Sequence, residues 1–321
     1  MTHRLRWPLA CDWTLIEIAR FYPGDRGKGS RLRPFFYGRW LDSWWPSTRL
    51  GKDPLEGLLV EGRYRPVSVA NWKLTPRMKQ LLLRKRVAQP LTFSPGQRLT
   101  IVIPFRDRQA HLQQLLPVLT NVLVKQNVLA KILVVEQAGH DLFNRGKLLN
   151  IGMQHAAAST DYYCLHDVDA VPVEADYRCP SQPLRLVHKL LTATGDTQRT
   201  DYYFSGAVSV TREQAFAANG FSNEYRGWGK EDDDFFFRLL LAGCLCYFDT
   251  RGVFEDLPNP SHQQVQRKSA DTPPHVRVNR QRRSRLLRGL VDPQDDGLST
   301  LSYDLLSSEQ GDGYEKICAG F

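Results

Sequence analysis

Apolar residues between positions 99 and 166 follow a pattern that predicts three buried strands joined by two amphipathic helices. The strand runs are rich in β-branched and aromatic residues, as buried parallel strands are: 99–104 (LTIVIP), 130–136 (AKILVVE) and 161–166 (DYYCLH). Residues 108–124 and 145–159 carry apolar side chains at helical spacing. This strand–helix order predicts an α/β fold built on a doubly wound, Rossmann-like sheet.

The pattern is looser on both sides of this unit. After it, we expect strands at 203–210 and 244–248, helices at 231–242 and 276–290, and a proline-rich loop at 256–274. Before it, residues 1–95 are rich in Arg, Trp and Pro and have weak periodicity. We therefore divide the chain into an N-terminal accessory segment, residues 1–95, and a main domain, residues 96–321.

The composition is that of a folded, basic protein. Of 321 residues, 42% are hydrophobic and 24% are charged, which excludes wholesale disorder. The net charge of +9 favours polyanionic partners, although solubility alone explains it equally well. Six cysteines without a C-x-x-C pair argue against a disulfide scaffold and a zinc ribbon. The most apolar stretch, 115–135, is interrupted by Asn, Gln and Lys, so no transmembrane segment is expected.

Two groups of polar residues follow predicted strands. Pro104-Phe105-Arg106 and Asp167-Val168-Asp169 both stand at carboxyl ends of strands, where doubly wound sheets bind their ligands. Carboxylate oxygens are ligands for Mg²⁺ or Mn²⁺, and a nucleotide diphosphate leaving group needs such a cation. A D-x-D triplet on its own fits an exposed turn as well.

A third group is the run 227–234 (GWGKEDDD). Two glycines around a tryptophan indicate a flexible loop with a flat surface for stacking on a sugar. A carboxylate beside it can deprotonate an acceptor hydroxyl. Acidic residues are also favoured in the first turn of a helix by the macrodipole, which accounts for part of the run. A fourth group, 143–147 (FNRGK), is a basic loop before a helix, where phosphates bind.

Seven stretches together resemble the β-1,4-galactosyltransferase family over about residues 99–305. They are VIPFRDRQAHL (102–112), FNRGKLLNIG (143–152), HDVDAVP (166–172), YRCPSQP (177–183), YYFSGAVSVT (202–211), NGFSNEYRGWGKEDDDFFFRL (219–239) and DGLSTLSY (296–303). The resemblance implies a nucleotide-sugar-binding glycosyltransferase fold of the A type, with residues 96–321 as the catalytic domain. It also implies inverting, metal-dependent transfer of galactose from UDP-galactose to a sugar hydroxyl, with a β-linkage that we expect to be β-1,4.

The resemblance further implies roles for individual residues. Those that would hold the uridine and diphosphate are Pro104, Phe105, Arg106, Arg108, Phe143 and Arg145. Asp167 would contact the donor with Val168 beside it, and Asp169 would bind Mn²⁺, with Mg²⁺ as the alternative ion. Those at the acceptor end would be Tyr203, Trp228, Gly229, Asp232 and Asp233, and Trp228 would also touch the donor. Glu231 and Asp232 would be the catalytic carboxylates, with Asp232 as the general base. A Tyr at position 203 is associated with galactose rather than its N-acetyl derivative.

The chain departs from the family in several places. A His-containing metal-ligand segment is usual after the strand that follows the acidic helix; here His262 is the candidate and Asp256 the substitute. Lys230 stands where small residues are common, which bears on the shape of the acceptor site. Cysteines near Cys164 and Cys179 form a disulfide in animal relatives, but the different spacing leaves a bond here undecided.

The sequence leaves the transferred sugar and the catalytic activity open. The same machinery can transfer N-acetylgalactosamine or another hexose, and a non-catalytic glycan-binding relative would keep the fold without turnover. We expect a UDP-sugar donor and a glycan or glycolipid acceptor as partners, with no nucleic acid. The basic stretch 277–288 suggests peripheral contact with an anionic membrane. We expect a cytoplasmic or peripheral membrane location, and the Golgi lumen only if this sequence is a shortened form.

Overall fold

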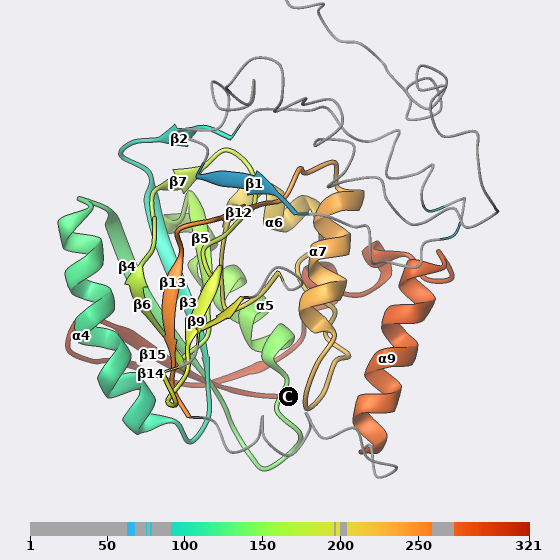
Figure 1. Ribbon diagram of the computed structural model, residues 1–321. Coiled ribbons are helices and arrows are strands. Elements are labelled where there is room, and N and C mark those ends of the chain that lie inside the picture. Colours follow the sequence, from blue (N-terminus) through green and yellow to red (C-terminus); the bar gives the residue numbers. More distant parts are fainter. Residues whose placement is uncertain are drawn as a thin grey trace, which may run out of the picture.

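The computed structural model describes residues 63–67, 75, 78, 91–195, 197–199, 204–258 and 273–321. Within them, nine strands form a central mixed sheet in the order β1-β12-β8-β11-β5-β3-β4-β15-β14 (Figure 1). The strands of this sheet are β1 (Tyr64–Pro66), β3 (Arg98–Phe105), β4 (Leu129–Gln137), β5 (Tyr162–His166), β8 (Leu184–Arg185), β11 (Ala207–Thr211), β12 (Tyr247–Asp249), β14 (Asp304–Gln310) and β15 (Glu315–Gly320).

The three strands predicted first form the middle of the sheet. β3 pairs in parallel with β4 on one side and with β5 on the other, so the predicted doubly wound unit is confirmed. Beyond it the sheet is mixed: β11 runs antiparallel to β5, and β15 runs parallel to β4. The hairpin of β14 and β15 lies in a part of the sequence for which no strand is predicted.

Helices cover both faces of this sheet (Figure 1). The helices are α4 (Gln109–Lys125), α5 (Arg145–Ala156), α6 (Arg212–Ala217), α7 (Glu231–Leu241) and α9 (Pro274–Leu287), with short 3₁₀ turns η4 (Ala157–Ser159), η5 (Pro293–Asp295) and η6 (Leu298–Thr300). Successive side chains of a strand point to opposite faces. Accordingly Ile101 and Ile103 pack in one apolar cluster with the leucines of α4, whereas Val102 packs in another with α5 and α7.

A smaller sheet lies next to the central one, in the strand order β10-β9-β13-β6. Its strands are β6 (Ala170–Glu174), β9 (Lys189–Leu191), β10 (Thr197–Arg199) and β13 (Val253–Asp256). The antiparallel pairing of β13 with β6 sets Asp256 opposite Ala170, and the Leu257 amide donates to the Asp169 carbonyl at 2.9 Å. The end of β13 therefore lies beside the Asp167-Val168-Asp169 turn.

Parts of the chain before residue 96 pair with strands of the main domain. β1 is antiparallel to β12, and β2 (Phe93–Ser94) pairs with β7 (Cys179–Pro180). The Arg63 guanidinium donates to both oxygens of buried Asp249, at 2.7 and 2.6 Å. Most of the accessory segment lies outside the described residues, so its boundary at residue 95 stays a prediction.

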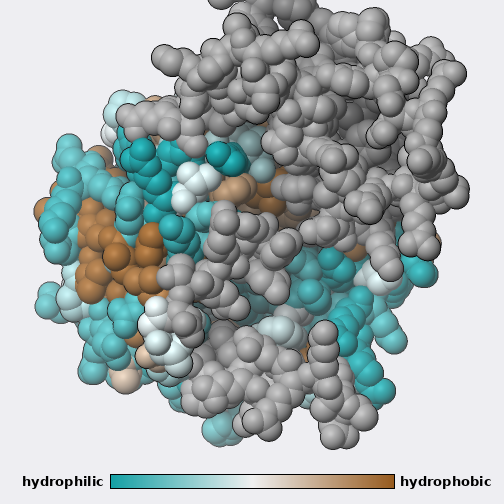
Figure 2. All heavy atoms as spheres, viewed as in Figure 1, coloured by the Kyte–Doolittle hydropathy of each residue, from teal (hydrophilic) through white to brown (hydrophobic). Residues whose placement is uncertain are grey.

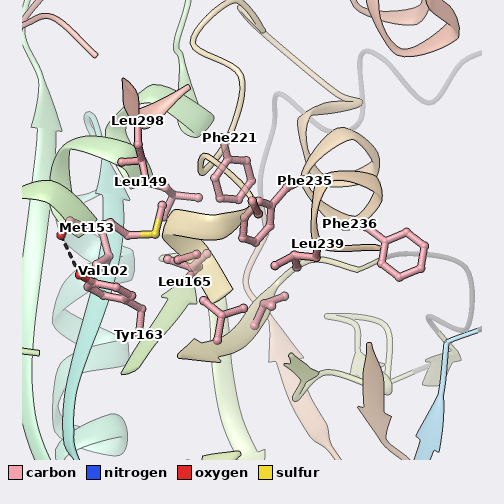
Figure 3. Packing of buried hydrophobic residues seen from close by; sticks show 14 of the residues in the cluster. Val102, Leu149, Met153, Tyr163, Leu165, Phe221, Phe235, Phe236, Leu239 and Leu298 are labelled. Carbon is pink, nitrogen blue, oxygen red and sulfur yellow. Dashed lines mark hydrogen bonds between the residues drawn. The ribbon is translucent and has the colours of Figure 1, made fainter. Parts of the chain in front are cut away.

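The N-terminal half of α7 is held by an aromatic cluster (Figure 3). The rings of Phe221 and Phe235 stack with centroids 4.1 Å apart, and both side chains are almost fully buried. Leu149 and Met153 of α5 belong to the same cluster. The cluster thus fixes the start of α7 against α5.

Gly152 of α5 faces the sheet where no side chain fits. A β-carbon at this position would lie 2.2 Å from Val102 Cγ1 and 3.1 Å from Val135 Cγ2. Gly152→Val should therefore lower the free energy of unfolding by about 1–3 kcal/mol, the usual cost of overpacking a core. Urea denaturation measures this, with Gln154→Val at an exposed position of the same helix as the control. Equal stability of the two variants would contradict this packing.

The described cysteines are all free, so no disulfide joins Cys164 to Cys179. Cys244 and Cys246 are buried, although β12 begins only at Tyr247, later than the predicted strand. None of the helices in the described ranges combines the length and the apolar character needed to cross a bilayer.

In Figure 2 apolar surface gathers on the side where Figure 1 places α4, and exposed Val118 and Val124 belong to that helix.

Candidate active site

The Asp167-Val168-Asp169 turn connects β5 to β6 at the carboxyl edge of the central sheet. The Asp167 amide donates to the Gly206 carbonyl at 2.7 Å, and the Ala170 amide donates to the Asp167 carbonyl at 3.3 Å. Asp169 is only 9% exposed, whereas the Asp167 side chain is 27% exposed. One carboxylate of the turn is therefore nearly buried, and the other is partly exposed.

His166 directly precedes the turn and contacts its backbone. Its Nδ1 lies 2.8 Å from the carbonyl oxygen of Asp167, and its Nε2 lies 3.0 Å from the Tyr177 hydroxyl. Burial lowers the pKa of His166 to about 4, so the ring is neutral at physiological pH. Because both ring nitrogens are engaged, His166 positions the turn. The sequence motif contains this histidine, but no spacing rule indicates its role.

The first residue of α5, Arg145, joins two separate parts of the site. Its Nε donates to Asp167 Oδ1 at 2.6 Å, and its Nη1 donates to Asp232 Oδ1 at 2.6 Å. Burial disfavours its charge, but the carboxylates of Asp167, Asp232 and Glu231 outweigh burial and raise the pKa of Arg145 above its ordinary value. The N-cap of α5, Asn144, is buried and accepts from the Lys147 amide at 2.9 Å, which fixes the helix start.

The end of β3 forms another wall. Pro104 and Phe105 are buried in the strand, and Phe105 belongs to the apolar cluster under α4. Arg106 donates to the Asp141 carbonyl at 2.6 Å, and its guanidinium lies 5.3 Å from the centre of the Phe143 ring. The structure thus brings together Arg106 and Phe143, two of the predicted donor residues. Arg108 follows at the start of α4 and is partly buried.

The Gly227-Trp228-Gly229 loop lies next to Phe143, one of these donor residues. Both glycines have positive φ angles, 68° and 93°, which favour glycine. The Gly227 amide donates to the Phe143 carbonyl at 2.8 Å, so this loop is tied to the basic loop before α5. Trp228 is 38% exposed, which leaves much of its ring surface available for stacking on a sugar.

The acidic run begins α7 directly after this loop. Glu231 is 7% exposed, and the Asp232 side chain is 25% exposed. Burial raises the pKa of Asp232; Arg145 opposes this rise, and the neighbouring carboxylates of Glu231, Asp167 and Asp233 add to it. The pKa of Glu231 is raised for the same reasons. A raised carboxylate pKa is what a general base near neutral pH needs.

The donor set of the site fits a divalent metal ion. The pairing of β6 with β13 places Asp169 and Asp256 on adjacent strand ends, and both carry hard oxygen ligands. Within the described ranges, no group of three or more His, Cys, Asp and Glu side chains is arranged to hold a metal. Mg²⁺-type sites commonly use one or two carboxylates together with substrate phosphates, so a pair of carboxylates suffices.

Helix α9 packs against the Gly-Trp-Gly loop and α7, a contact for which the sequence carries no signal. The Asn279 amide donates to the carbonyls of Arg226 and Trp228, at 3.0 and 3.3 Å. A β-carbon at Gly227 would lie 2.5 Å from the His275 ring. This close approach requires glycine at position 227. The loop is thereby held between α5 and α9.

Two of the predicted site residues, Tyr203 and His262, lie outside the described residues. The others converge on the carboxyl edge of the sheet and the start of α7. Arg145, which is expected to hold the donor diphosphate, forms ion pairs with Asp167, Asp232 and Glu231 in this structure.

Comparisons with known proteins agree with this geometry. A family model for the N-terminal region of glycosyl transferase group 7 matches residues 63–180, and one for the N-terminal domain of galactosyltransferase matches 186–254. Human β-1,4-galactosyltransferase 1 is 36% identical over 226 residues, covering 68% of this chain and 54% of its own length. The catalytic domain of Drosophila β-1,4-galactosyltransferase 7, solved with xylobiose, is 30% identical, with a TM-score of 0.58; the match covers 70% of this chain and 93% of that domain. This chain belongs to the β-1,4-galactosyltransferase family.

The match to the family extends further toward the N-terminus than the sequence motifs do, because it begins at residue 63 rather than near residue 99. The family also confirms the A-type glycosyltransferase fold. Bovine β-1,4-galactosyltransferase 3 is another relative, 35% identical over 236 residues, with 72% of this chain and 57% of that protein covered. The chain spans about half the length of these curated relatives.

Proposed function

We propose that this protein transfers galactose from UDP-galactose to a sugar hydroxyl with inversion, forming a β-linkage that is β-1,4. The observation that carries this proposal is the double ion pair of Arg145, at 2.6 Å to both Asp167 and Asp232. It joins one strand-end carboxylate, Asp167, and the helix-start carboxylate, Asp232, through one guanidinium. A related structure, a mutant of the Drosophila β-1,4-galactosyltransferase 7, holds manganese, UDP-galactose and xylobiose.

The arrangement supports a division of labour between the carboxylates. Inversion requires the acceptor oxygen to attack from the face opposite the departing diphosphate. Asp232, beside the Trp228 loop, takes the proton of the acceptor hydroxyl as general base. Trp228 offers its exposed ring to the sugars, and Glu231 keeps a carboxylate beside Asp232. The raised pKa of Asp232 strengthens it as a base.

The donor is held by residues of the β3 end and the α5 start. Arg106 and Phe143, which are in contact, would bind the uridine and diphosphate together with Arg108 and Asp167. Tyr203, outside the described residues, would select galactose over its N-acetyl derivative. Asp169 and Asp256 would hold Mn²⁺, and this ion would supply positive charge to offset the charge that develops on the diphosphate.

A transfer assay tests the proposal. The enzyme with Mn²⁺ is given UDP-galactose, UDP-N-acetylgalactosamine or UDP-glucose, each with N-acetylglucosamine, glucose or xylose as acceptor. We expect transfer to be fastest from UDP-galactose. Preference for another donor would replace galactose in the proposal, and the absence of transfer with every pair would favour a glycan-binding protein without turnover.

Asp256 is the second metal ligand in this proposal, because it lies at the end of β13 beside the Asp167-Val168-Asp169 turn. Asp256→Ala should raise the Mn²⁺ concentration for half-maximal activity about 10-fold or more, whereas His262→Ala should change it less. Activity titrated against Mn²⁺ measures both. If His262→Ala causes the larger shift, Asp256 is not the ligand.

Arg145 should control the pH at which Asp232 acts. Its positive charge opposes the rise of the Asp232 pKa, so Arg145→Gln should raise that pKa further. Because the base must be deprotonated, the acid limb of the kcat/KM profile should move to higher pH, by about 1 unit or more. Arg212→Gln, at a surface position distant from the site, is the control. An unshifted limb in Arg145→Gln would mean that another group is the base.

A further inference from the structure

Helix α9 is unusually basic for a helix beside an active site. Its 14 residues include five arginines and no acidic residue, and Arg288 follows at its C-cap. Arginines stand three residues apart in the pairs Arg277 and Arg280, Arg280 and Arg283, and Arg282 and Arg285. Like charges at this spacing destabilise a helix. Such a helix is therefore suited to a negative ligand that relieves the repulsion.

The charges on α9 divide into two sets. Arg283 faces Asp233 on α7 and Arg282 faces Glu224, so these two arginines are engaged. Arg277, Arg280, Arg285 and Arg288 are exposed and have no ion-pair partner among the described residues. Figure 2 shows hydrophilic surface on the side where Figure 1 places α9.

The acceptor end of the site is continuous with this basic helix. Asp233 is 8% exposed and is approached by two cations, Lys230 Nζ at 3.1 Å and Arg283 Nε at 2.7 Å. These three groups together carry one net positive charge, next to the carboxylates of Glu231 and Asp232 that pair with Arg145. The side chains of Lys230 and Arg283 are 30% and 26% exposed, so a ligand can reach both.

The conformation of Lys230 adds a second observation. Its φ angle is 84°, a left-handed conformation that costs a residue with a side chain about 1–2 kcal/mol relative to the right-handed one. Glycine would adopt it without strain. A lysine held in this conformation, next to Gly229 and directly before the catalytic carboxylates, places an ammonium group at the acceptor end.

We propose that the acceptor carries a negative group, a carboxylate or a phosphate, next to the sugar that receives galactose. This inference rests on the proposed function and specifies its acceptor class. Lys230 and Arg283 bind the negative group, and Arg280 contributes from the next turn of α9, since residues three apart lie on one side of a helix. Guanidinium groups bind carboxylates and phosphates in a bidentate manner, so either group on the acceptor would fit.

An anionic membrane is the rival occupant of the α9 surface. A membrane would bind the exposed arginines of α9. Membrane binding would not explain the two cations beside buried Asp233 or the left-handed conformation of Lys230 beside the catalytic carboxylates. The positions of these groups favour a glycan ligand.

The test compares acceptors that differ in one group. The terminal sugar of each acceptor is the one among N-acetylglucosamine, glucose and xylose that accepts galactose. Its anomeric carbon carries a neutral galactose residue, a galacturonate residue or a phosphate. We expect KM at low salt to be about tenfold lower for at least one anionic acceptor than for the neutral one, and the difference to shrink as salt screens the charges. Comparison of the galacturonate and phosphate acceptors shows whether the subsite prefers a carboxylate or a phosphate.

Variants then locate the subsite. Arg280→Gln, at an exposed position without a partner, and Arg283→Gln should each reduce the preference for the anionic acceptor several-fold. The control, Lys125→Gln with Lys189→Gln, removes two positive charges from exposed positions elsewhere and should keep the preference. Circular dichroism and the melting temperature verify that each variant folds.

The outcomes separate the inference from the proposed function. Transfer to all acceptors with equal KM, or a preference that both variants retain, overturns the inference and leaves galactosyl transfer standing. No transfer to any acceptor overturns the proposed function and this inference with it. If Arg280→Gln loses binding to phosphatidylserine vesicles while the acceptor preference stays unchanged, the α9 surface binds membrane and the inference is wrong.

Discussion

Asp232→Asn should lower the rate of galactosyl transfer by about 10²–10⁴-fold, the usual contribution of a general base. The amide keeps the size of the side chain but accepts no proton. Arg145 holds Asp232 at 2.6 Å and can still donate to the amide oxygen, so the local structure should persist. The loss should appear in kcat, because the acceptor and donor still bind.

Three measurements separate this loss from misfolding. Calorimetry should show that the variant binds UDP with Mn²⁺ as the unaltered protein does, and its melting temperature should change little. Asp312→Asn, at an exposed turn between β14 and β15, is the matched control and should retain full activity. Near-normal transfer by Asp232→Asn would assign the base to another group, with Glu231 the next candidate.

Asp169→Ala should abolish Mn²⁺-dependent transfer. The carboxylate lies in the turn between β5 and β6 and is 9% exposed, next to the end of β13 that carries Asp256. Without it, the pair of carboxylates that fits a divalent ion becomes a single one, and the charge on the departing diphosphate is no longer neutralised. We expect a loss of at least about 10²-fold in kcat/KM at saturating Mn²⁺, comparable with the strongest effects of lost metal ligands.

The control for this substitution is Glu174→Ala, an exposed carboxylate on β6 itself. It should retain activity and the same Mn²⁺ dependence. Asp169→Ala should keep a melting temperature close to that of the unaltered protein, because the apolar packing of the turn comes from Val168, which the variant retains. Full activity of the unaltered protein in a strong chelator would remove the metal from the mechanism, whatever the variant does.

The middle of the fold could be predicted from the sequence because its signals are local. β3, β4 and β5 are runs of β-branched and aromatic residues, and the leucines of α4 recur at helical spacing. The C-terminal hairpin could not be predicted in the same way. Strand β14 is exposed along its whole length, so no alternation of buried and exposed residues marks it. Its pairing with β15, and that of β15 with β4, joins residues distant in sequence.

In the site, too, local motifs could be predicted from the sequence and contacts between distant residues could not. The Asp167-Val168-Asp169 turn and the Gly-Trp-Gly loop are contiguous motifs, and the residue types in them indicate their chemistry. The bridging role of Arg145 is a tertiary contact between α5, the turn and α7, which no spacing reveals. The position of Asp256 beside the Asp167-Val168-Asp169 turn depends on the pairing of β13 with β6, which joins residues distant in sequence.

Inverting transfer of galactose is tested most directly by the linkage in the product. The enzyme is incubated with Mn²⁺, with UDP-galactose labelled with ¹³C at the anomeric carbon, and with the best acceptor of the panel, and the product is examined by NMR. The donor is α-linked, so attack from the opposite face gives a β-linked galactose. We expect a large three-bond coupling between H1 and H2 of the new galactose residue, typical of a β-galactoside, and a linkage to O4 of the acceptor. An α-linked product would contradict the account.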